Sequence, residues 1–270
     1  DAIITEKDCG TKDGVIINKI SASGLEISIT KNIKGRILAT DVKDVSGNVL
    51  FKKGTFMTEE QARQIEDAGI ESVNVRSPMV CKTQQGICQN CYGIDMTTNN
   101  PIEIGEAVGT VAAQAIGEPG TQLTMRTFHT GGTASVGGDI TQGLPRVEEV
   151  FEKRSPKNPA LIAHIDGTVS EIKNHEKEKL IILLPNKSEK GTKSKKSTEY
   201  RVHFRRMSFV KVGDKVSKGD FLTDGSANID ELFKYSDREK TQNYIISEIN
   251  RIYELQGASI SRKHIEVIIK

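Results

Sequence analysis

The sequence lacks tryptophan entirely, and its aromatic residues make up only 5% of 270 residues. With 36% hydrophobic residues, this scarcity predicts several small cores instead of one large core. Net charge is also nearly absent, since 38 Lys and Arg oppose 36 Asp and Glu, which excludes a uniformly basic coat for nucleic acid. No apolar run approaches the roughly 18 residues of a membrane helix, and residues 1–10 are too polar for a secretory signal. We therefore expect a cytoplasmic protein, or a part of one, with no membrane partner.

Cysteine is scarce as well, because the chain has only Cys9, Cys81, Cys88 and Cys91. The last three form a Cys-x6-Cys-x2-Cys pattern, and a Cys-x2-Cys turn lets two thiolates bind one ion from a single loop. Tetrahedral Zn²⁺ takes four such ligands, and four thiolates leave no position for a reactive water molecule. The spacing predicts one structural zinc ion that joins the start of the chain to residues 81–91. Two disulfides, a redox-active Cys-x2-Cys pair and buried apolar cysteines are the alternatives, although a long chain without a secretory signal disfavours disulfides.

Residues 1–100 have the pattern of a small α+β subdomain closed by these cysteines. Thr58 is a candidate N-cap with Gln61 three residues later, for a helix that ends at Gly69. A Ser-Gly-Asn turn at 46–48 indicates a hairpin between residues 35–42 and 49–51. Further strands are expected at residues 15–17, 25–29 and 72–75.

Residues 101–158 are rich in glycine and alanine, and they predict a helical hairpin with a glycine-rich loop. One helical face runs through residues 105–117, and the Gly-Glu-Pro-Gly sequence at 117–120 is expected to break or kink that helix. A second helical segment begins at Thr121, and glycine pairs at 131–132 and 137–138 flank a short tip. Asp139 and Thr141 are candidate caps for a return helix from about Leu144 to Arg154.

The rest of the chain has two further parts, a β-rich part and a helical part. Residues 159–227 predict a β-rich, sandwich-like domain, with strands at 161–165, 167–172, 180–184 and 200–204 and a tight turn at 212–220. Residues 228–270 predict one long amphipathic helix over 230–256, stopped by Gly257, and a closing apolar segment at 265–269. The expected fold class is thus α+β in four parts, with boundaries near residues 100, 158 and 227.

Residues 120–129, Gly-Thr-Gln-Leu-Thr-Met-Arg-Thr-Phe-His, carry the strongest signal for chemistry. In a helix, Gln122, Met125, Arg126 and His129 lie at i, i+3, i+4 and i+7 and share one face. We call these four residues the stripe. An amide, a thioether, a guanidinium and an imidazole suit a nucleoside triphosphate, because methionine can pack on a base while the cations meet phosphate oxygens. Glycines on both sides would let the segment close over a ligand and reopen. A solvated helix face is the alternative interpretation.

Two other functions are compatible with parts of the sequence. Residues 186–206 contain eight Lys or Arg against two Glu, which suits a non-enzymatic, zinc-stabilised module that binds nucleic-acid phosphates, or simply a solvated hairpin loop. The turn at 212–220 also resembles that of biotinyl- or lipoyl-carrier folds. No Met-Lys-Met sequence stands near it, so this likeness concerns the scaffold only.

The motifs around the cysteines and the stripe are similar to those of a known family. They are Cys88-Gln-Asn-Cys91-Tyr-Gly, the Gly-Glu-Ala-Val-Gly that begins at Gly105, the run over 112–132, and the Asp-Ile-Thr-Gln-Gly-Leu-Pro-Arg-Val that begins at Asp139. This series closely resembles the β′ subunit of bacterial DNA-directed RNA polymerase, nearly without gaps across residues 81–154. Looser similarity at residues 8–11, 255–257 and 263–267 makes the whole chain similar to an internal stretch of β′.

The resemblance implies a role for each singled-out residue. Cys9, Cys81, Cys88 and Cys91 match the ligands of that subunit's second zinc site. Residues 121–138 match its mobile trigger loop, which folds into a helical hairpin when the correct NTP is bound, and residues 160–225 match its jaw, near downstream DNA. In the trigger loop, the resemblance assigns Met125 to the incoming base, Gln122 to a further substrate-binding position, and Arg126 and His129 to the phosphates as catalytic residues.

One departure limits what this chain is expected to do by itself. The Asn-Ala-Asp-Phe-Asp-Gly-Asp run that binds catalytic Mg²⁺ in β′ is absent from the sequence, and the bridge helix would precede Asp1. We therefore expect a segment of a larger subunit that is inactive alone and obtains its Mg²⁺ ligands from elsewhere. The implied partners are the rest of β′, the β, α, ω and σ subunits, template and downstream DNA, and NTPs, all in the bacterial cytoplasm or nucleoid.

Overall fold

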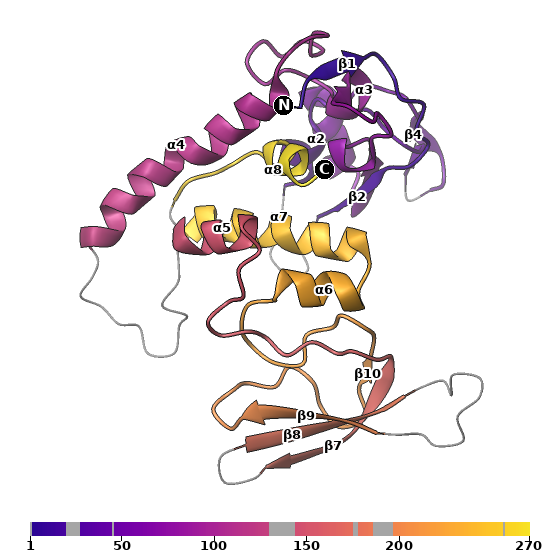
Figure 1. Ribbon diagram of the computed structural model, residues 1–270. Helices are drawn as coiled ribbons and strands as arrows, with labels where there is room; N and C mark the ends of the chain where they lie inside the picture. Colours follow the sequence, from indigo (N-terminus) through magenta and orange to yellow (C-terminus); the bar gives the residue numbers. More distant parts are fainter. Residues whose placement is uncertain are drawn as a thin grey trace. The chain divides into compact units, whose positions relative to one another are not determined.

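The computed structural model describes residues 2–19, 28–44, 46–129, 144–174, 178–185, 197–255 and 257–270, and the side chains of 120–129, 144 and 174 are not among them. It divides into two compact units, one made of Asp1–Gln122 with Gly257–Lys270 and the other of Leu123–Gln256. Figure 1 shows helices mixed with several small sheets, in agreement with the expected α+β class.

The main core of the first unit lies between a two-stranded sheet and two helices. Strand β2 (Val15–Asn18) pairs antiparallel with β5 (Ser72–Val75), and its alternating buried and exposed residues direct one face inward. Helices α1 (Ile29–Ile33) and α2 (Glu59–Asp67) pack on each other, and α1 contacts both strands. The core formed by these elements and the segments that connect them contains Ile17, Ile29, Ile33, Leu38, Val42, Met57, Ala62, Ile65, Val73 and Val75.

Two local expectations for this unit are confirmed. Thr58 and Gln61 form a complete capping box at the start of α2, and Gly69, just beyond its end, has a φ of +71°. The hairpin forms from β3 (Val42–Lys43) and β4 (Val49–Phe51), which pair antiparallel. Its first strand is much shorter than the expected 35–42.

The strand expected at residues 25–29 is wrong where the chain is described, because Ile29 begins helix α1. The Oγ of Ser28 accepts a hydrogen bond from the backbone N–H of Lys31, which caps the helix. Ile29 and Ile33 lie one helical turn apart, and both are fully buried. Ile29 therefore belongs to a helical period, and residues 25–27 lie outside the described residues.

A buried ion pair fixes helix α8 (Arg262–Ile268) to the N-terminal part of the first unit. Glu266 is fully buried, and its carboxylate accepts hydrogen bonds from Arg36 at 2.7 and 3.1 Å and from the Ser77 hydroxyl at 2.7 Å. Arg262 adds a third cationic contact at 2.8 Å. Because both oxygens of the carboxylate are satisfied, the buried charges are compensated and α8 has a defined position.

The helix expected to break or kink at residues 117–120 does not break there and continues through them. Helix α4 runs from Val108 to His129 with Pro119 inside it (Figure 1). A proline within a helix removes one backbone donor and crowds the carbonyl four residues earlier, which weakens a helix without excluding it. The return helix is confirmed as α5 (Leu144–Phe151) and ends three residues earlier than expected. The glycine pairs, the tip and the candidate caps at 139 and 141 lie outside the described residues.

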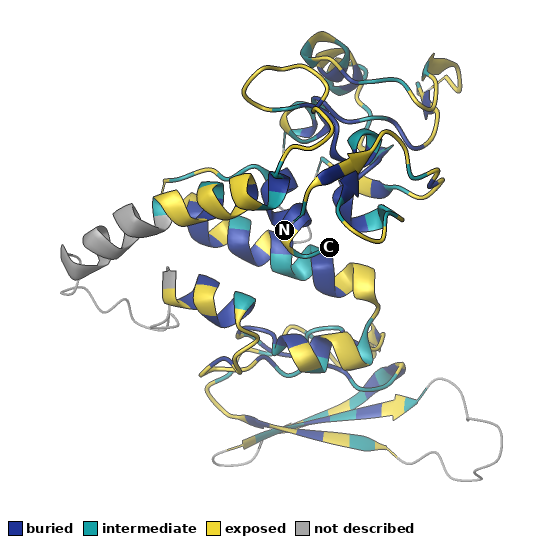
Figure 2. Ribbon diagram, turned by 45° about the horizontal axis from the view of Figure 1, so that its top comes forward, coloured by how far each residue is buried: buried dark blue, intermediate teal, exposed yellow. Residues whose placement is uncertain are grey.

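The second unit contains a four-stranded antiparallel sheet in the order β10-β7-β8-β9. Its strands are β7 (Gly167–Asn174), β8 (Glu178–Pro185), β9 (Thr198–His203) and β10 (Lys215–Val216), which confirms three of the four strands expected before the turn at 212–220. Buried residues alternate with intermediate or exposed ones along β9, as in a sheet with one solvated face (Figure 2). The expected strand at 161–165 is instead an isolated bridge between Ile162 and Phe221, because Thr223 and Tyr200 side chains accept the backbone N–H groups of Leu161 and His164.

The single helix expected over 230–256 is two helices, α6 (Ile229–Tyr235) and α7 (Arg238–Leu255). Ser236 has an extended backbone, with φ −125° and ψ −178°, which ends α6. Serine and aspartate favour such boundaries because their side chains compete for local backbone groups, and Asp237 follows directly. Helix α5 packs on α7, where the buried guanidinium of Arg146 contacts Glu149 and Glu248 at 3.1 and 3.2 Å.

Candidate metal centre

Strand pairing brings the four cysteines together from three separate places in the chain. Strand β1 (Ile4–Glu6) pairs parallel with β6 (Ile87–Cys88), so that Cys9, just after β1, lies near Cys88. Cys91 lies in the short helix α3 (Gln89–Tyr92), which Cys88 caps. Cys81 follows the 3₁₀ turn η1 (Pro78–Val80).

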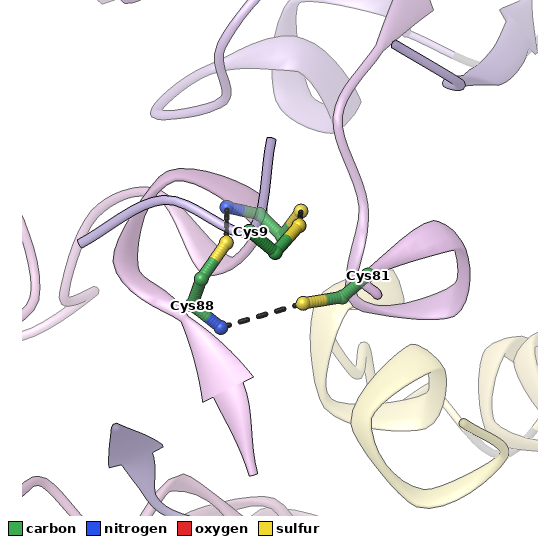
Figure 3. Close-up of side chains that lie close together, drawn as sticks. Cys9, Cys81 and Cys88 are labelled. Carbon is green, nitrogen blue, oxygen red and sulfur yellow. Dashed lines mark hydrogen bonds between the residues drawn. The ribbon is translucent and has the colours of Figure 1, made fainter. Parts of the chain in front are cut away.

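The four sulfur atoms form one compact group. All four lie within 4.8 Å of one another, and Figure 3 shows Cys9, Cys81 and Cys88 approaching one another from different segments of the chain. No disulfide joins them. Backbone N–H groups of Cys88 and Cys91 donate to the Sγ atoms of Cys81 and Cys88, each at 3.4 Å, and Lys82 donates to Cys9 at 3.4 Å. This group could hold one metal ion, and backbone donors oriented toward sulfur suit thiolate ligands.

Glycines allow the two turns around this group to approach other backbone closely. Gly86 has a φ of +84°, and a Cβ atom there would lie 2.1 Å from the Ile3 carbonyl oxygen. Gly93 has a φ of +87°, and its Cβ atom would lie 2.0 Å from the Gly35 carbonyl oxygen. Any larger residue would push β1 or the α1 segment away from the cysteines.

Arg76 places a positive charge directly beside the sulfur atoms. Its Nη2 lies 3.2 Å from the Sγ of Cys91, 3.5 Å from that of Cys9 and 3.6 Å from that of Cys88, and it donates to Asp8 at 2.7 Å. Burial lowers the pKa of Arg76, but the hydrogen bonds to Asp8 and Cys91 more than offset this effect, so its pKa is raised overall. A permanent cation therefore faces the centre, where four thiolates around a divalent ion would carry a net charge of −2.

The thiols influence one another strongly because they are so close. Hydrogen bonding from Cys88 and Cys91 lowers the pKa of Cys81, while hydrogen bonding to Cys81 and Cys88 raises the pKa of Cys91. Such a group holds one negative charge easily and further ones only with difficulty. Full deprotonation of all four sulfurs requires a bound cation, which matches the donor set of a tetrahedral zinc site.

The centre is continuous with a second hydrophobic core of the first unit. Cys88 and Cys91 are buried with Ile4, Ile87, Tyr92, Ile102, Val108, Ala112 and Val267, and Cys9 and Cys81 pack against this group. The core thus joins β1, β6, the start of α4 and helix α8. Metal binding here would connect segments that are distant in sequence, which is a structural role.

Replacing Arg76 with methionine should weaken metal retention without removing a ligand. The uncompensated negative charge on the thiolates would then be buried, and loss of such outer contacts typically costs about 10- to 100-fold in metal affinity. Metal release to a chromogenic chelator measures the effect. Arg63→Met, at an arginine whose side chain is 68% exposed, is the control. Equal release rates in the two variants would show that Arg76 does not support the centre.

The predicted stripe lies on a helical backbone, as its spacing requires. Gln122, Met125, Arg126 and His129 all fall within α4. Their side chains are outside the described part of the structure, so the shared face stays a prediction. Sequence reasoning missed Arg76 and Asp8 as partners of the cysteines. Two features of the sequence could have indicated them. Arg76 directly follows the predicted strand at 72–75 and lies five residues before Cys81, and Asp8 is the neighbour of Cys9.

The whole chain matches one protein family. The family model described as RNA polymerase Rpb1, domain 5, covers residues 1–270, and the chain therefore belongs to this family. Among curated proteins, it is 45% identical over 272 residues to the DNA-directed RNA polymerase subunit beta′ of Natranaerobius thermophilus. It is 43% and 46% identical to the subunits of the same name from Clostridium botulinum and Caldicellulosiruptor saccharolyticus. The resemblance inferred from the motifs is thus confirmed over the entire chain.

These relatives are much longer than this chain. All of its residues are matched in each comparison, but they cover only 21 to 22% of the relatives' own length. The chain therefore corresponds to about a fifth of a β′ subunit. Within the described residues, no helix combines the length and the apolar composition needed to cross a bilayer.

Proposed function

We propose that the chain works as part of a DNA-directed RNA polymerase and that residues 121–138 close on the incoming NTP during DNA-templated RNA synthesis. The observation that carries this proposal is the full-length match to the polymerase family, combined with the stripe on helix α4. A helix of small and polar residues followed by glycine pairs suits a segment that folds over a substrate. The activity belongs to the assembled enzyme.

In this role the stripe contributes binding and electrostatic stabilisation. Met125 packs on the nucleotide base and Gln122 adds a polar contact, while Arg126 and His129 face the phosphates. Negative charge grows on the departing pyrophosphate, and cations already held beside it stabilise the transition state more than the ground state. The Mg²⁺ ligands come from another part of the subunit, since this sequence lacks the acidic motif.

The four cysteines hold a structural Zn²⁺ ion in this proposal. The donor set fits zinc, because four thiols with backbone N–H donors and a facing guanidinium match a closed tetrahedral site. The ion would fasten the segments around Cys9 and Cys81–Cys91 and so give the base of α4 a rigid support. No reaction step passes through it.

The proposed partners and cellular location are those expected for a bacterial member of this family. The partners are the rest of β′, the β, α, ω and σ subunits, DNA and NTPs, in the bacterial cytoplasm, with the 159–227 region toward downstream DNA. The four-part division at residues 100, 158 and 227 is kept as the functional division of the chain. Most of the basic stretch 186–206 lies outside the described residues.

Deletion of residues 121–138 in the assembled polymerase tests the proposal. Replacing them with a short glycine linker should slow single-nucleotide addition on a primed template by about 100-fold or more, because substrate closure and phosphate stabilisation are both lost. Template binding and zinc content should not change, and they serve as the internal controls. An unchanged addition rate, with DNA affinity that depends on residues 186–206, would instead support the non-enzymatic, nucleic-acid-binding module.

A further inference from the structure

A small cavity in the first unit is lined by ten residues, of which five are basic. Its volume is about 120 Å³, and it lies between the end of α1, the turn at residues 94–99 and the start of α8. We propose that this cavity binds a tetrahedral oxyanion, such as a free phosphate or the terminal phosphate of a nucleotide. This assignment is independent of the proposed polymerase role.

Five cationic residues line the cavity from two distant parts of the chain, residues 31–36 and the start of α8. They are Lys31, Lys34, Arg36, Arg262 and Lys263, and no aspartate or glutamate lines the cavity among the residues that the structure describes. Cations from distant parts of the chain repel one another when they converge. Such an arrangement costs free energy unless an anion, from the protein or from solution, compensates it.

The protein's own carboxylates compensate only part of this charge. Lys34 pairs with Glu59 at 2.8 Å, and Glu266 serves both Arg36 and Arg262. Lys31 is exposed and forms no ion pair with any residue that the structure describes. With Asp95, whose charge acts on Lys263, three carboxylates face five cations, so positive charge is in excess around the cavity.

Lys263 is the buried member of the set. Its side chain is only 4% exposed, and its ammonium donates to the Ile94 carbonyl at 2.9 Å and lies 4.8 Å from the centre of the Tyr92 ring. Neither of these partners, a backbone carbonyl and an aromatic ring, carries a negative charge. The ammonium has two further N–H donors, and within the described chain no carboxylate forms an ion pair with it.

The lowered pKa of Lys263 is consistent with an ammonium that has no anionic partner in direct contact. Burial, followed by the charge of Arg36, lowers the pKa of Lys263 to about 7, against the opposing influence of Glu266 and Asp95. An anion in the cavity would offset both depressing effects, because it would contact the ammonium and lie among the same cations. A lysine perturbed in this way inside a cavity is a common feature of binding sites.

Neutral donors complete a polar lining. Ser261 lies at the cavity and precedes α8, and its hydroxyl makes no capping hydrogen bond to that helix. Asn99 also lines the cavity, and its side chain carries an amide donor. A tetrahedral oxyanion has several acceptor oxygens, and the mixture of ammonium, hydroxyl and amide donors can satisfy them from different sides.

Calorimetric titration of the zinc-loaded chain with sulfate tests the proposal at constant ionic strength. Sulfate is a tetrahedral dianion that does not change its charge near neutral pH. One site should be saturated with a dissociation constant of about 1 mM or tighter. Lys31→Glu should weaken sulfate binding by about tenfold, and the chain should still fold because Lys31 is exposed. Lys263→Met should weaken sulfate binding by more than about tenfold.

Lys52→Glu is the matched control, because it makes the same change of charge at an exposed lysine outside the cavity lining. Its affinity for sulfate should stay within about twofold of the parent. Equal weakening in Lys31→Glu and Lys52→Glu, or no saturable binding by the parent chain, would overturn the proposal. The Lys31→Glu result remains decisive if Lys263→Met does not fold.

Competition experiments distinguish the sources of the anion. Inorganic phosphate and adenosine monophosphate should each displace sulfate from the parent chain and not from a Lys31→Glu background. Displacement by both would indicate a site for a terminal phosphate group, and displacement by inorganic phosphate alone a site for the free ion. Failure of both to compete would contradict an oxyanion site of this shape.

Discussion

Replacing Cys88 with serine is expected to abolish zinc binding and to unfold the first unit. Cys88 is central because its thiol is one of the four proposed ligands, its backbone N–H donates to Cys81 and its side chain is fully buried in the core beside the four sulfurs. Structural zinc contributes on the order of 10 kcal/mol, which is comparable to the whole stability of a typical domain. A serine hydroxyl would not replace the thiolate, so the first unit would lose most of its net stability.

Zinc stoichiometry and thermal unfolding measure this effect together. Thr83→Val is a suitable control, because the Thr83 hydroxyl accepts from Cys81 at 3.2 Å and donates to Glu6 at 2.6 Å but is not one of the four sulfurs. That variant should keep one zinc ion per chain and melt close to the parent temperature. A Cys88→Ser chain with full zinc content and an unchanged melting temperature would show that the cysteines are not a metal centre.

Single alanine substitutions at Arg126 and at His129 should each slow nucleotide addition by about 10- to 100-fold in the assembled polymerase. Both positions lie on α4 at a spacing that places them on one helical face. If they support the phosphates of the NTP, each substitution removes a stabilising contact that is strongest in the transition state. Zinc content should not change, because the cysteines lie elsewhere.

Single-turnover addition at saturating NTP separates this effect from weaker substrate binding. Thr124→Ala is the matched control, since helical spacing places residue 124 on the opposite side of α4 from the stripe. Its addition rate should stay near that of the parent. Parent-like rates in both Arg126→Ala and His129→Ala would contradict the assigned role and leave only the metal-supported scaffold.

Features that depend on neighbours in the sequence were well predicted. Thr58 and Gln61 interact across one helical turn, and the hairpin at 49–51 follows from a turn of three residues. The Cys88–Cys91 pair needs only one loop to bring its sulfurs together. In each case the deciding contacts lie within a few residues, so the pattern is visible in the chain itself.

Boundaries were less predictable where two local preferences competed. The apolar alternation that ends at Ile29 favoured a strand, yet Ser28 caps a helix whose two isoleucines enter the core. Apolar periodicity over 230–256 indicated one helix, but Ser236 ends α6 in an extended conformation. Packing decided the first case, because tertiary burial outweighs the small free-energy differences of local propensity. In the second case, local competition of the Ser236 and Asp237 side chains for backbone groups favours the boundary.

The amino-acid order alone therefore determined which residues are candidates for chemistry, namely four cysteines, which the structure brings together, and a series from Gln122 to His129 on a helical backbone, whose role stays a prediction. It did not reveal what surrounds them. Arg76 reaches the sulfurs only after β1 pairs with β6, and Arg36 meets Glu266 across 230 positions of chain. Contacts of that kind leave no periodic trace in the sequence, since they depend on how separate elements pack and on which charges must be compensated once water is excluded.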